Sequence, residues 1–208
     1  MRPADLDAVT LDAFGTLVGL VNPVPALTEG LRALGVECDS GSVARAFAKE
    51  VAYYRERSHE GRDDATLYAL RRDCVAVILD DLGSDVDPAA FVDGFVDAMR
   101  FELLPGARRA VERLRRLGLA LAVVSNWDVG LRELLHGLGL DGVTVVTSAE
   151  AGAPKPEPAV FLRALERLGV RAERSLHVGD SGADEDGARA AGMHFAPAPL
   201  ERALEALA

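Results

Sequence analysis

The chain has few lysines, few cysteines and no long apolar run. Only two of its 23 basic residues are lysines, Lys49 and Lys155, and 33 acidic residues leave a net charge of −10. This balance argues against nucleic acid or an anionic membrane surface as a main partner. No apolar stretch approaches the roughly 20 residues that a membrane-spanning helix needs. The two cysteines show no Cys-x-x-Cys spacing, so they indicate neither a disulfide framework nor a zinc site.

Several sequence signals of other protein classes are also missing. The N-terminus lacks the basic and then apolar pattern of a secretory signal, which together with the missing apolar run predicts a cytoplasmic protein. The chain contains no Gly-x-Gly-x-x-Gly, no phosphate-binding P-loop, no His-Glu-x-x-His and no Gly-x-Ser-x-Gly. What is present is a chain of 208 residues, 49% of them hydrophobic, which is enough for one ordinary domain or a domain with an insertion.

Short β-like runs alternate with amphipathic helical segments over most of the chain. Two of these runs are almost entirely apolar, as expected of strands that are covered on both faces. The alternation predicts βαβ units and a parallel sheet, and hence an α/β fold. The expected strands are Val9–Leu11, Leu119–Val124, Val143–Val146 and Ser175–Val178.

Residues 19–100 do not follow this alternation. Their apolar residues recur at helical spacing, and no convincing strand interrupts them. We therefore predict a helical subdomain over 19–100, inserted after the first strand into a core made of residues 1–18 and 101–208. The helices expected in the insertion are Pro25–Leu34, Ser42–Arg57, Asp63–Leu82 and Pro88–Met99.

Polar residues follow each expected strand of the core. In a parallel α/β sheet, ligands bind beyond the carboxyl ends of the strands, so these residues should converge. Taken singly, each could cap a helix or terminate a turn. Four such positions at one edge of a sheet favour a functional site instead. The segments are Asp12–Thr16, Ser125–Asp128, Thr147–Lys155 and Gly179–Asp184.

Together, these segments resemble the motifs of the haloacid dehalogenase superfamily of aspartate-nucleophile hydrolases. The matching residues, in chain order, are Leu11–Leu17, Val124–Asn126, Lys155–Pro158 and His177–Ser181 with Asp184. The resemblance implies a Rossmann-like three-layer α/β/α core with a parallel sheet and a helical cap inserted after the first motif. The cap corresponds to the insertion inferred above from periodicity.

The resemblance also implies roles for individual residues. Asp12 is the nucleophile that forms a covalent aspartyl intermediate, while Ser125 and Lys155 bind the transferred group and complete the catalytic set. Thr16 and Asn126 join Ser125 and Lys155 in binding the substrate. The implied cofactor is Mg²⁺, which prefers hard oxygen ligands. Its ligands are Asp12, the Phe14 backbone carbonyl, Asp180 and Asp184.

Phe14 departs from the phosphatase pattern of the family. Phosphatases usually carry an aspartate there as general acid and base, and its loss typically costs about 10²–10⁴-fold in rate. The dehalogenase branch carries an aromatic residue at this position but generally lacks the metal-binding carboxylate pair. Because Asp180 and Asp184 are both present and are best neutralised by a cation, we predict a slow Mg²⁺-dependent phosphatase acting on a small anionic substrate such as a phosphate monoester.

Three alternatives stay open at this point. One is a metal-independent 2-haloacid dehalogenase, although Phe161 stands where that pattern has a tyrosine. Another is a catalytically weakened binding or regulatory protein. The third is the phosphonate-cleaving branch, in which a cap lysine forms a Schiff base; Lys49 lies in the expected cap, but pairing on a helix surface is its more ordinary role. The sequence leaves open whether the protein is a monomer or a homodimer.

Overall fold

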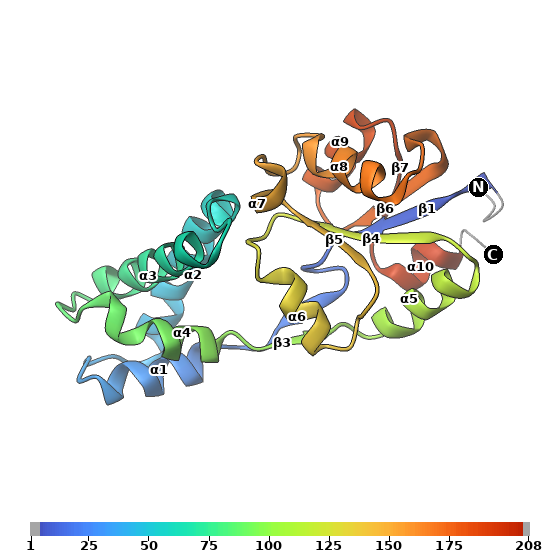
Figure 1. Ribbon diagram of the computed structural model, residues 1–208. Coiled ribbons are helices and arrows are strands. Elements are labelled where there is room, and N and C mark those ends of the chain that lie inside the picture. Colours follow the sequence, from blue (N-terminus) through green and yellow to red (C-terminus); the bar gives the residue numbers. More distant parts are fainter. Residues whose placement is uncertain (1–4, 206–208) are drawn as a thin grey trace. The chain divides into compact units, whose positions relative to one another are not determined.

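The computed structural model describes residues 5–205, which fold into two compact units. The first, here termed the sheet unit, combines the chain up to Gly19 with the chain from Glu102 onward. The second, the helical unit, spans Leu20–Phe101 (Figure 1). Within residues 5–205, no helix is both long enough and apolar enough to cross a membrane.

A parallel sheet of five strands forms the centre of the sheet unit, in the order β5-β4-β1-β6-β7 (Figure 1). All four residues of the central strand β1 are buried, as expected for a strand covered on both faces. The four strands expected from the sequence are all present. The strands of this sheet are β1 (Ala8–Leu11), β4 (Ala120–Ser125), β5 (Thr144–Thr147), β6 (Ser175–Gly179) and β7 (His194–Pro197).

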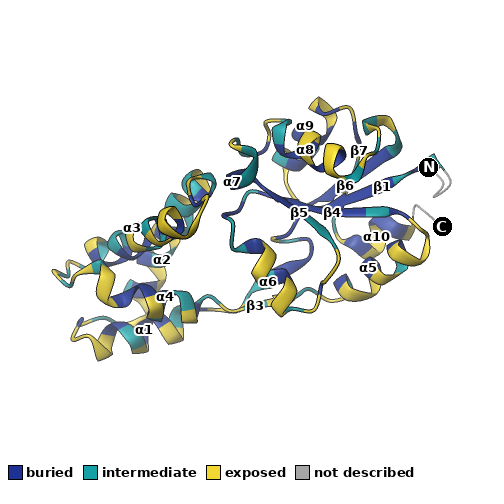
Figure 2. Cartoon of the chain, viewed as in Figure 1, coloured by how far each residue is buried: buried dark blue, intermediate teal, exposed yellow. Residues whose placement is uncertain are grey.

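Helices cover both faces of this sheet. Helices α8 and α9 lie on one side, and α5, α6 and α10 lie on the other (Figure 1). Their buried residues face the sheet and their outer sides are exposed (Figure 2), so the predicted three-layer α/β/α fold is confirmed. The helices are α5 (Ala107–Arg116), α6 (Leu131–Gly137), α7 (Ser148–Ala151), α8 (Ala159–Leu168), η4 (Ala172–Arg174), α9 (Gly182–Ala190) and α10 (Leu200–Glu205).

The helical unit packs its helices around an apolar cluster that includes Leu31, Val43 and Ile78. Aspartates at the starts of α2 and α3 form capping boxes, which satisfy backbone N–H groups that have no partner within the helix. The elements of this unit are α1 (Val24–Ala33), α2 (Ser40–Arg57), η2 (Ser58–Glu60), α3 (Asp64–Asp81), η3 (Pro88–Phe91) and α4 (Val92–Ala98).

Two details of residues 19–101 differ from the sequence prediction. The single helix expected over Pro88–Met99 is divided into η3 and α4, because Phe91 leaves the helical conformation with φ −119° and ψ 2°. Short strands β2 (Val18–Leu20) and β3 (Phe101–Leu103) pair where the chain passes between the units, although no strand was expected at the start of the insertion. Three residues are too few to show a strand pattern in the sequence.

The helical unit buries one carboxyl group in its interior. Glu50 on α2 is 4% exposed, and Cys74 on α3 is its hydrogen-bonding neighbour. Burial raises the pKa of Glu50 to about 7, and the bond to the Cys74 side chain offsets only part of this effect. A carboxyl group with this pKa makes the stability of the unit depend on pH near neutrality.

Candidate active site

The loop after β1 places Asp12 at the carboxyl edge of the sheet. The Asp12 backbone N–H donates to Val178 O on β6 (2.9 Å), which fixes the start of the loop to the neighbouring strand. The chain then turns at Gly15, whose φ of +80° lies in the left-handed region that favours glycine. The Asp12 side chain ends up buried, with 4% of the residue exposed.

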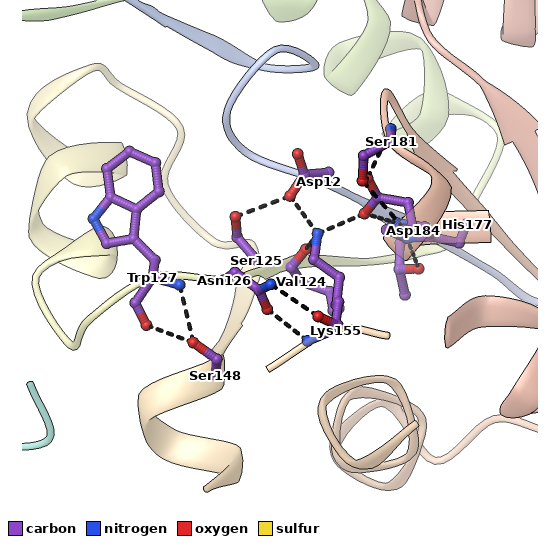
Figure 3. Close-up of polar contacts among 11 residues, drawn as sticks. Asp12, Val124, Ser125, Asn126, Trp127, Ser148, Lys155, His177, Ser181 and Asp184 are labelled. Atoms are coloured by element: carbon purple, nitrogen blue, oxygen red, sulfur yellow. Dashed lines mark hydrogen bonds and ion pairs between the residues drawn. The ribbon is translucent and has the colours of Figure 1, made fainter. Parts of the chain in front are cut away.

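Asp12 and Lys155 form a buried ion pair. Lys155 Nζ donates to Asp12 Oδ1 at 2.6 Å, and Ser125 Oγ donates to the same oxygen at 2.9 Å (Figure 3). Lys155 Nζ also reaches Asp184 Oδ1 at 2.5 Å. Burial alone lowers the pKa of Lys155, but the carboxylates of Asp12 and Asp184 outweigh this effect and raise it above its ordinary value. The ammonium group therefore stays charged between the two carboxylates.

Asn126 holds the backbone of Lys155 in place. The Lys155 N–H donates to Asn126 Oδ1 at 2.7 Å, and Asn126 Nδ2 donates to Lys155 O at 3.2 Å (Figure 3). The next residue, Trp127, is fixed in turn by Ser148 at the start of α7, which bonds both its N–H and its carbonyl. The motif resemblance predicts that Asn126 binds substrate, but the sequence does not predict these contacts, because a side chain that bonds a remote backbone leaves no sequence pattern.

Asp184 has hydrogen bonds on both carboxylate oxygens. Oδ1 accepts from Lys155 Nζ and from His177 Nε2 (3.0 Å), and Oδ2 accepts from Ser181 N (3.1 Å) and Ser181 Oγ (2.5 Å). The bonds to Ser181 complete a capping box at the start of α9. Burial by itself raises the pKa of Asp184, but the bonds from His177, Lys155 and Ser181 outweigh it and hold the pKa well below its usual range. Four bonds use the four acceptor positions of a carboxylate.

His177 lies on β6 and contacts Asp184 at the start of α9, with 0% of its surface exposed. Its Nδ1 lies 2.8 Å from Thr10 Oγ1, and the Phe161 and His177 rings pack at an angle of 85° with their centroids 4.9 Å apart. Burial lowers the pKa of His177, although the bond to Asp184 partly opposes this, so the ring is neutral. No local sequence pattern predicts its bond to Asp184, which lies seven residues further along the chain.

Asp180 is the exposed member of the acidic cluster. Partial burial, followed by repulsion from Asp12 and Asp184, raises its pKa. Its Oδ2 lies only 2.0 Å from where a Cβ would stand on Gly15, so glycine at that position makes room for the carboxylate. Among the described residues, Asp12, Asp180 and Asp184 can each offer an oxygen within 4.8 Å of the others. Three carboxylates against one ammonium group form a donor set that suits a divalent cation with hard oxygen preferences.

Two residues of the first loop complete the site. Thr16 is 4% exposed, and its Oγ1 is buried without a hydrogen-bond partner among the described residues. A buried hydroxyl without a partner is costly, which is consistent with an oxygen-rich ligand that completes the site. Phe14 is 41% exposed and offers no proton donor from its side chain. Phe161, by contrast, is fully buried beside His177, so it supplies no group to the acidic cluster.

A family model for haloacid dehalogenase-like hydrolases matches residues 6–192. The chain belongs to this hydrolase family. The match spans both the sheet unit and the helical unit and includes every segment that contributes to the acidic cluster. The resemblance inferred from the four motifs is therefore confirmed.

Curated relatives and solved structures agree with this membership. The chain is 33% identical over 204 residues to haloacid dehalogenase-like hydrolase domain-containing protein 3 of Mus musculus, covering 89% of this chain and 79% of that protein. It is 32% identical over 206 residues to a phosphoglycolate phosphatase of Rhodospirillum rubrum, with 89% and 76% covered. The L-2-haloacid dehalogenase of Xanthobacter autotrophicus, solved with chloropropionic acid covalently bound, is 26% identical with a TM-score of 0.68, and 92% and 77% of the chains are covered.

Proposed function

We propose that this family member is a Mg²⁺-dependent phosphatase that cleaves small phosphate monoesters through an aspartyl-phosphate at Asp12. The observation that carries the proposal is the acidic cluster. Asp12, Asp180 and Asp184 lie within 4.8 Å of one another at their oxygens, and Lys155 alone among the described residues contributes a cationic side chain in contact with the cluster's buried pair. The remaining negative charge is best balanced by a divalent cation. The phosphoglycolate phosphatase relative supports the same reading.

The reaction follows from the bonds that Asp12 already makes. Oδ1 is held by Ser125 and Lys155, which leaves Oδ2 to attack the phosphorus atom of the substrate. The bond between phosphorus and the ester oxygen breaks, and the alcohol leaves with its electron pair. Water then attacks the phosphorus of the aspartyl-phosphate, releasing phosphate and restoring the Asp12 carboxylate. Lys155 offsets the repulsion between the incoming dianion and the nucleophile.

Several other residues surround the transferred group in this proposal. Ser125 and Thr16 supply hydroxyl groups to its oxygens, and the Thr16 hydroxyl has no described partner that competes for it. The Asn126 amide has two N–H groups, and one of them bonds Lys155 O. Asn126 can therefore bind the substrate only through its second N–H. Its main contribution is to hold the Lys155 backbone, and through it the ammonium group.

The residues proposed to hold Mg²⁺ are Asp12, Asp180, the Phe14 backbone carbonyl and Asp184. Among the described residues, no backbone N–H donates to the Phe14 carbonyl, so its oxygen can serve as a ligand. Four hydrogen bonds already use the acceptor positions of Asp184, so Asp184 can hold the ion, directly or through water, only in place of one of these bonds. When bound, Mg²⁺ supplies electrostatic stabilisation to the charge that develops on the phosphoryl oxygens.

Phe14 limits which substrates such a site can use. Its side chain cannot protonate the departing oxygen, and the missing acid typically costs about 10²–10⁴-fold in rate. An ester whose alcohol leaves as a stable anion, such as an aryl phosphate, avoids most of this loss. We therefore propose a preference for phosphate esters with good leaving groups over simple alkyl phosphates.

Phe14 also favours a second candidate, a metal-independent 2-haloacid dehalogenase, because a departing halide needs no proton. The 26% identity to an L-2-haloacid dehalogenase supports this alternative. It gives no use for Asp180, which a metal-independent reaction would leave as an unneutralised carboxylate beside the nucleophile. For this reason we place it second.

Initial rates distinguish the two candidates. The protein is assayed for phosphate release from an aryl phosphate and for halide release from a 2-haloacid, each with Mg²⁺ and with EDTA. We expect phosphate release that requires Mg²⁺ and is lost in Asp12→Asn, while Asp186→Asn, an exposed position on α9, retains it. Turnover of the aryl phosphate that persists in EDTA would contradict the proposal, and metal-free halide release would establish the dehalogenase.

A further inference from the structure

A buried polar pair lies beneath the acidic cluster, between the two central strands. Thr10 on β1 is the register partner of His177 on β6, so the two residues are neighbours in the parallel sheet. Both are 0% exposed, and Thr10 Oγ1 lies 2.8 Å from His177 Nδ1. Their neighbours on the same face of the sheet include apolar, buried residues: Ala122 on β4 is the register partner of Thr10, and the Phe161 ring packs against His177. A polar pair in such a layer has a desolvation cost that an apolar pair of similar volume avoids.

The direction of the hydrogen bonds in this pair is fixed by its neighbour. His177 Nε2 lies 3.0 Å from Asp184 Oδ1, and an ionised carboxylate can only accept, so Nε2 carries the ring proton. In the neutral ring, Nδ1 is then an acceptor, and the Thr10 hydroxyl must donate to it. The resulting chain of bonds runs from Thr10 through His177 to Asp184 and on to Lys155.

We propose that Thr10 and His177 are positioning residues that orient the Asp184 carboxylate to receive Lys155 Nζ, and so place the ammonium group against Asp12. The proposal rests on the proposed function, since it describes how the nucleophile's cationic partner is held. Neither residue touches the reacting atoms; both act through Asp184. Thr10 sets the tautomer of His177, and His177 sets the rotation of the carboxylate.

The capping of α9 does not account for this pair. The capping box uses Asp184 Oδ2 with Ser181, whereas His177 bonds the other oxygen, Oδ1. That same oxygen accepts from Lys155 Nζ at 2.5 Å. An imidazole that only filled space in the core would need no partner on the oxygen that faces the lysine. The bond from His177 therefore acts on Oδ1, the Asp184 oxygen that also bonds Lys155.

The test uses the isosteric variant Thr10→Val, which removes the hydroxyl, and Thr10→Ser, which keeps it. Thr28→Val in the helical unit is the control, because Thr28 is also buried, at 4% exposure, and its Oγ1 donates to Val24 O at 2.7 Å. We expect kcat on an aryl phosphate to fall about 10–100-fold in Thr10→Val, a loss typical of residues that orient a functional side chain through a hydrogen bond. KM should stay near the wild-type value, Thr10→Ser should recover most of kcat, and Thr28→Val should leave kcat unchanged.

The second readout is the tautomer of His177, measured by ¹⁵N NMR on the full-length protein without substrate. We expect the Nε2–H tautomer in wild type and in Thr10→Ser, and a mixture of tautomers in Thr10→Val. Unchanged kcat in Thr10→Val, an equal loss in Thr10→Ser, or the Nδ1–H tautomer in wild type would overturn the proposal. If wild type hydrolyses no phosphate ester, the proposed function fails, and the tautomer pattern still decides whether Thr10 directs His177 toward Asp184.

Discussion

Lys155 Nζ lies 2.6 Å from Asp12 Oδ1, and both side chains are almost completely buried, at 4% and 6% exposure. Charges in such a position are stable only when paired and hydrogen-bonded, because each loses its hydration on folding. The pair is extended by Asp184 on one side and by Ser125 on the other. Asp12, the proposed nucleophile, is therefore held by a cation whose removal would leave buried carboxylates without their partner.

Replacing Lys155 should lower the free energy of unfolding. Lys155→Met leaves Asp12 and Asp184 buried without their ammonium group, and breaking a buried pair in this way typically costs about 3–5 kcal/mol. Urea unfolding should show a loss of this size, and added Mg²⁺ should stabilise the variant more than it stabilises wild type. The matched control is Lys49→Met, since Lys49 pairs with Asp81 but is 65% exposed. Equal stability of the two variants would contradict the account.

A methyl group on Gly15 should displace Asp180. Its Cβ would lie 2.0 Å from Asp180 Oδ2, and Gly15 has φ +80°. Gly118→Ala is the control, because Gly118 has φ +74° and no atom within 4 Å of its Cβ position. Both variants share the left-handed strain of about 1–2 kcal/mol, so calorimetric titration with Mg²⁺ isolates the clash. We expect affinity to fall about tenfold or more in Gly15→Ala and to stay at the wild-type level in Gly118→Ala.

The buried carboxyl group of Glu50 should make the free energy of unfolding depend on pH, independently of the active site. Its folded pKa of about 7 lies above the ordinary value of 4.5, so the folded state holds the proton more tightly than the unfolded state. The contribution of Glu50 to the free energy of unfolding is therefore fully present below pH 4.5. It is lost as the pH rises toward 7, by about 3 kcal/mol in all. Glu50→Gln should remove this loss and stabilise the protein at pH 8 but not at pH 4.5, measured by urea unfolding.

The control for that measurement is Glu56→Gln on the same helix, whose side chain is 74% exposed and should leave the pH profile unchanged. A Glu50→Gln profile that runs parallel to that of wild type from pH 4.5 to 8 would show that Glu50 does not titrate differently in the two states.

The sequence predicted the parts of the fold that depend on local pattern. Strands such as Ala120–Ser125 are continuous apolar runs followed by polar residues, and both features are visible without a structure. Strand His194–Pro197 was missed, because a short edge strand that begins with histidine and ends with proline has neither feature. Its place in the sheet comes from pairing with β6, which is a tertiary interaction.

The site shows the same division. The order of the motifs predicted that Asp12, Ser125 and Lys155 would meet, and the structure brings them within hydrogen-bonding distance. The pattern around Asp184 fits both a metal ligand and a capping-box residue, and only the contacts show that its carboxylate already has four hydrogen bonds. The bond between Thr10 and His177 depends on strand register across 167 residues of sequence, which no local pattern encodes.

In the proposed reaction, Asp12 attacks phosphorus and carries the transferred group. The most direct measurement is mass spectrometry of the peptide that contains Asp12 after acid quenching of the protein during turnover of an aryl phosphate with Mg²⁺. We expect a phosphoryl adduct on Asp12 that forms in wild type, is absent with EDTA and is absent in Asp12→Asn. Steady phosphate release with no adduct on Asp12, and with the same rate in Asp12→Asn, would contradict it.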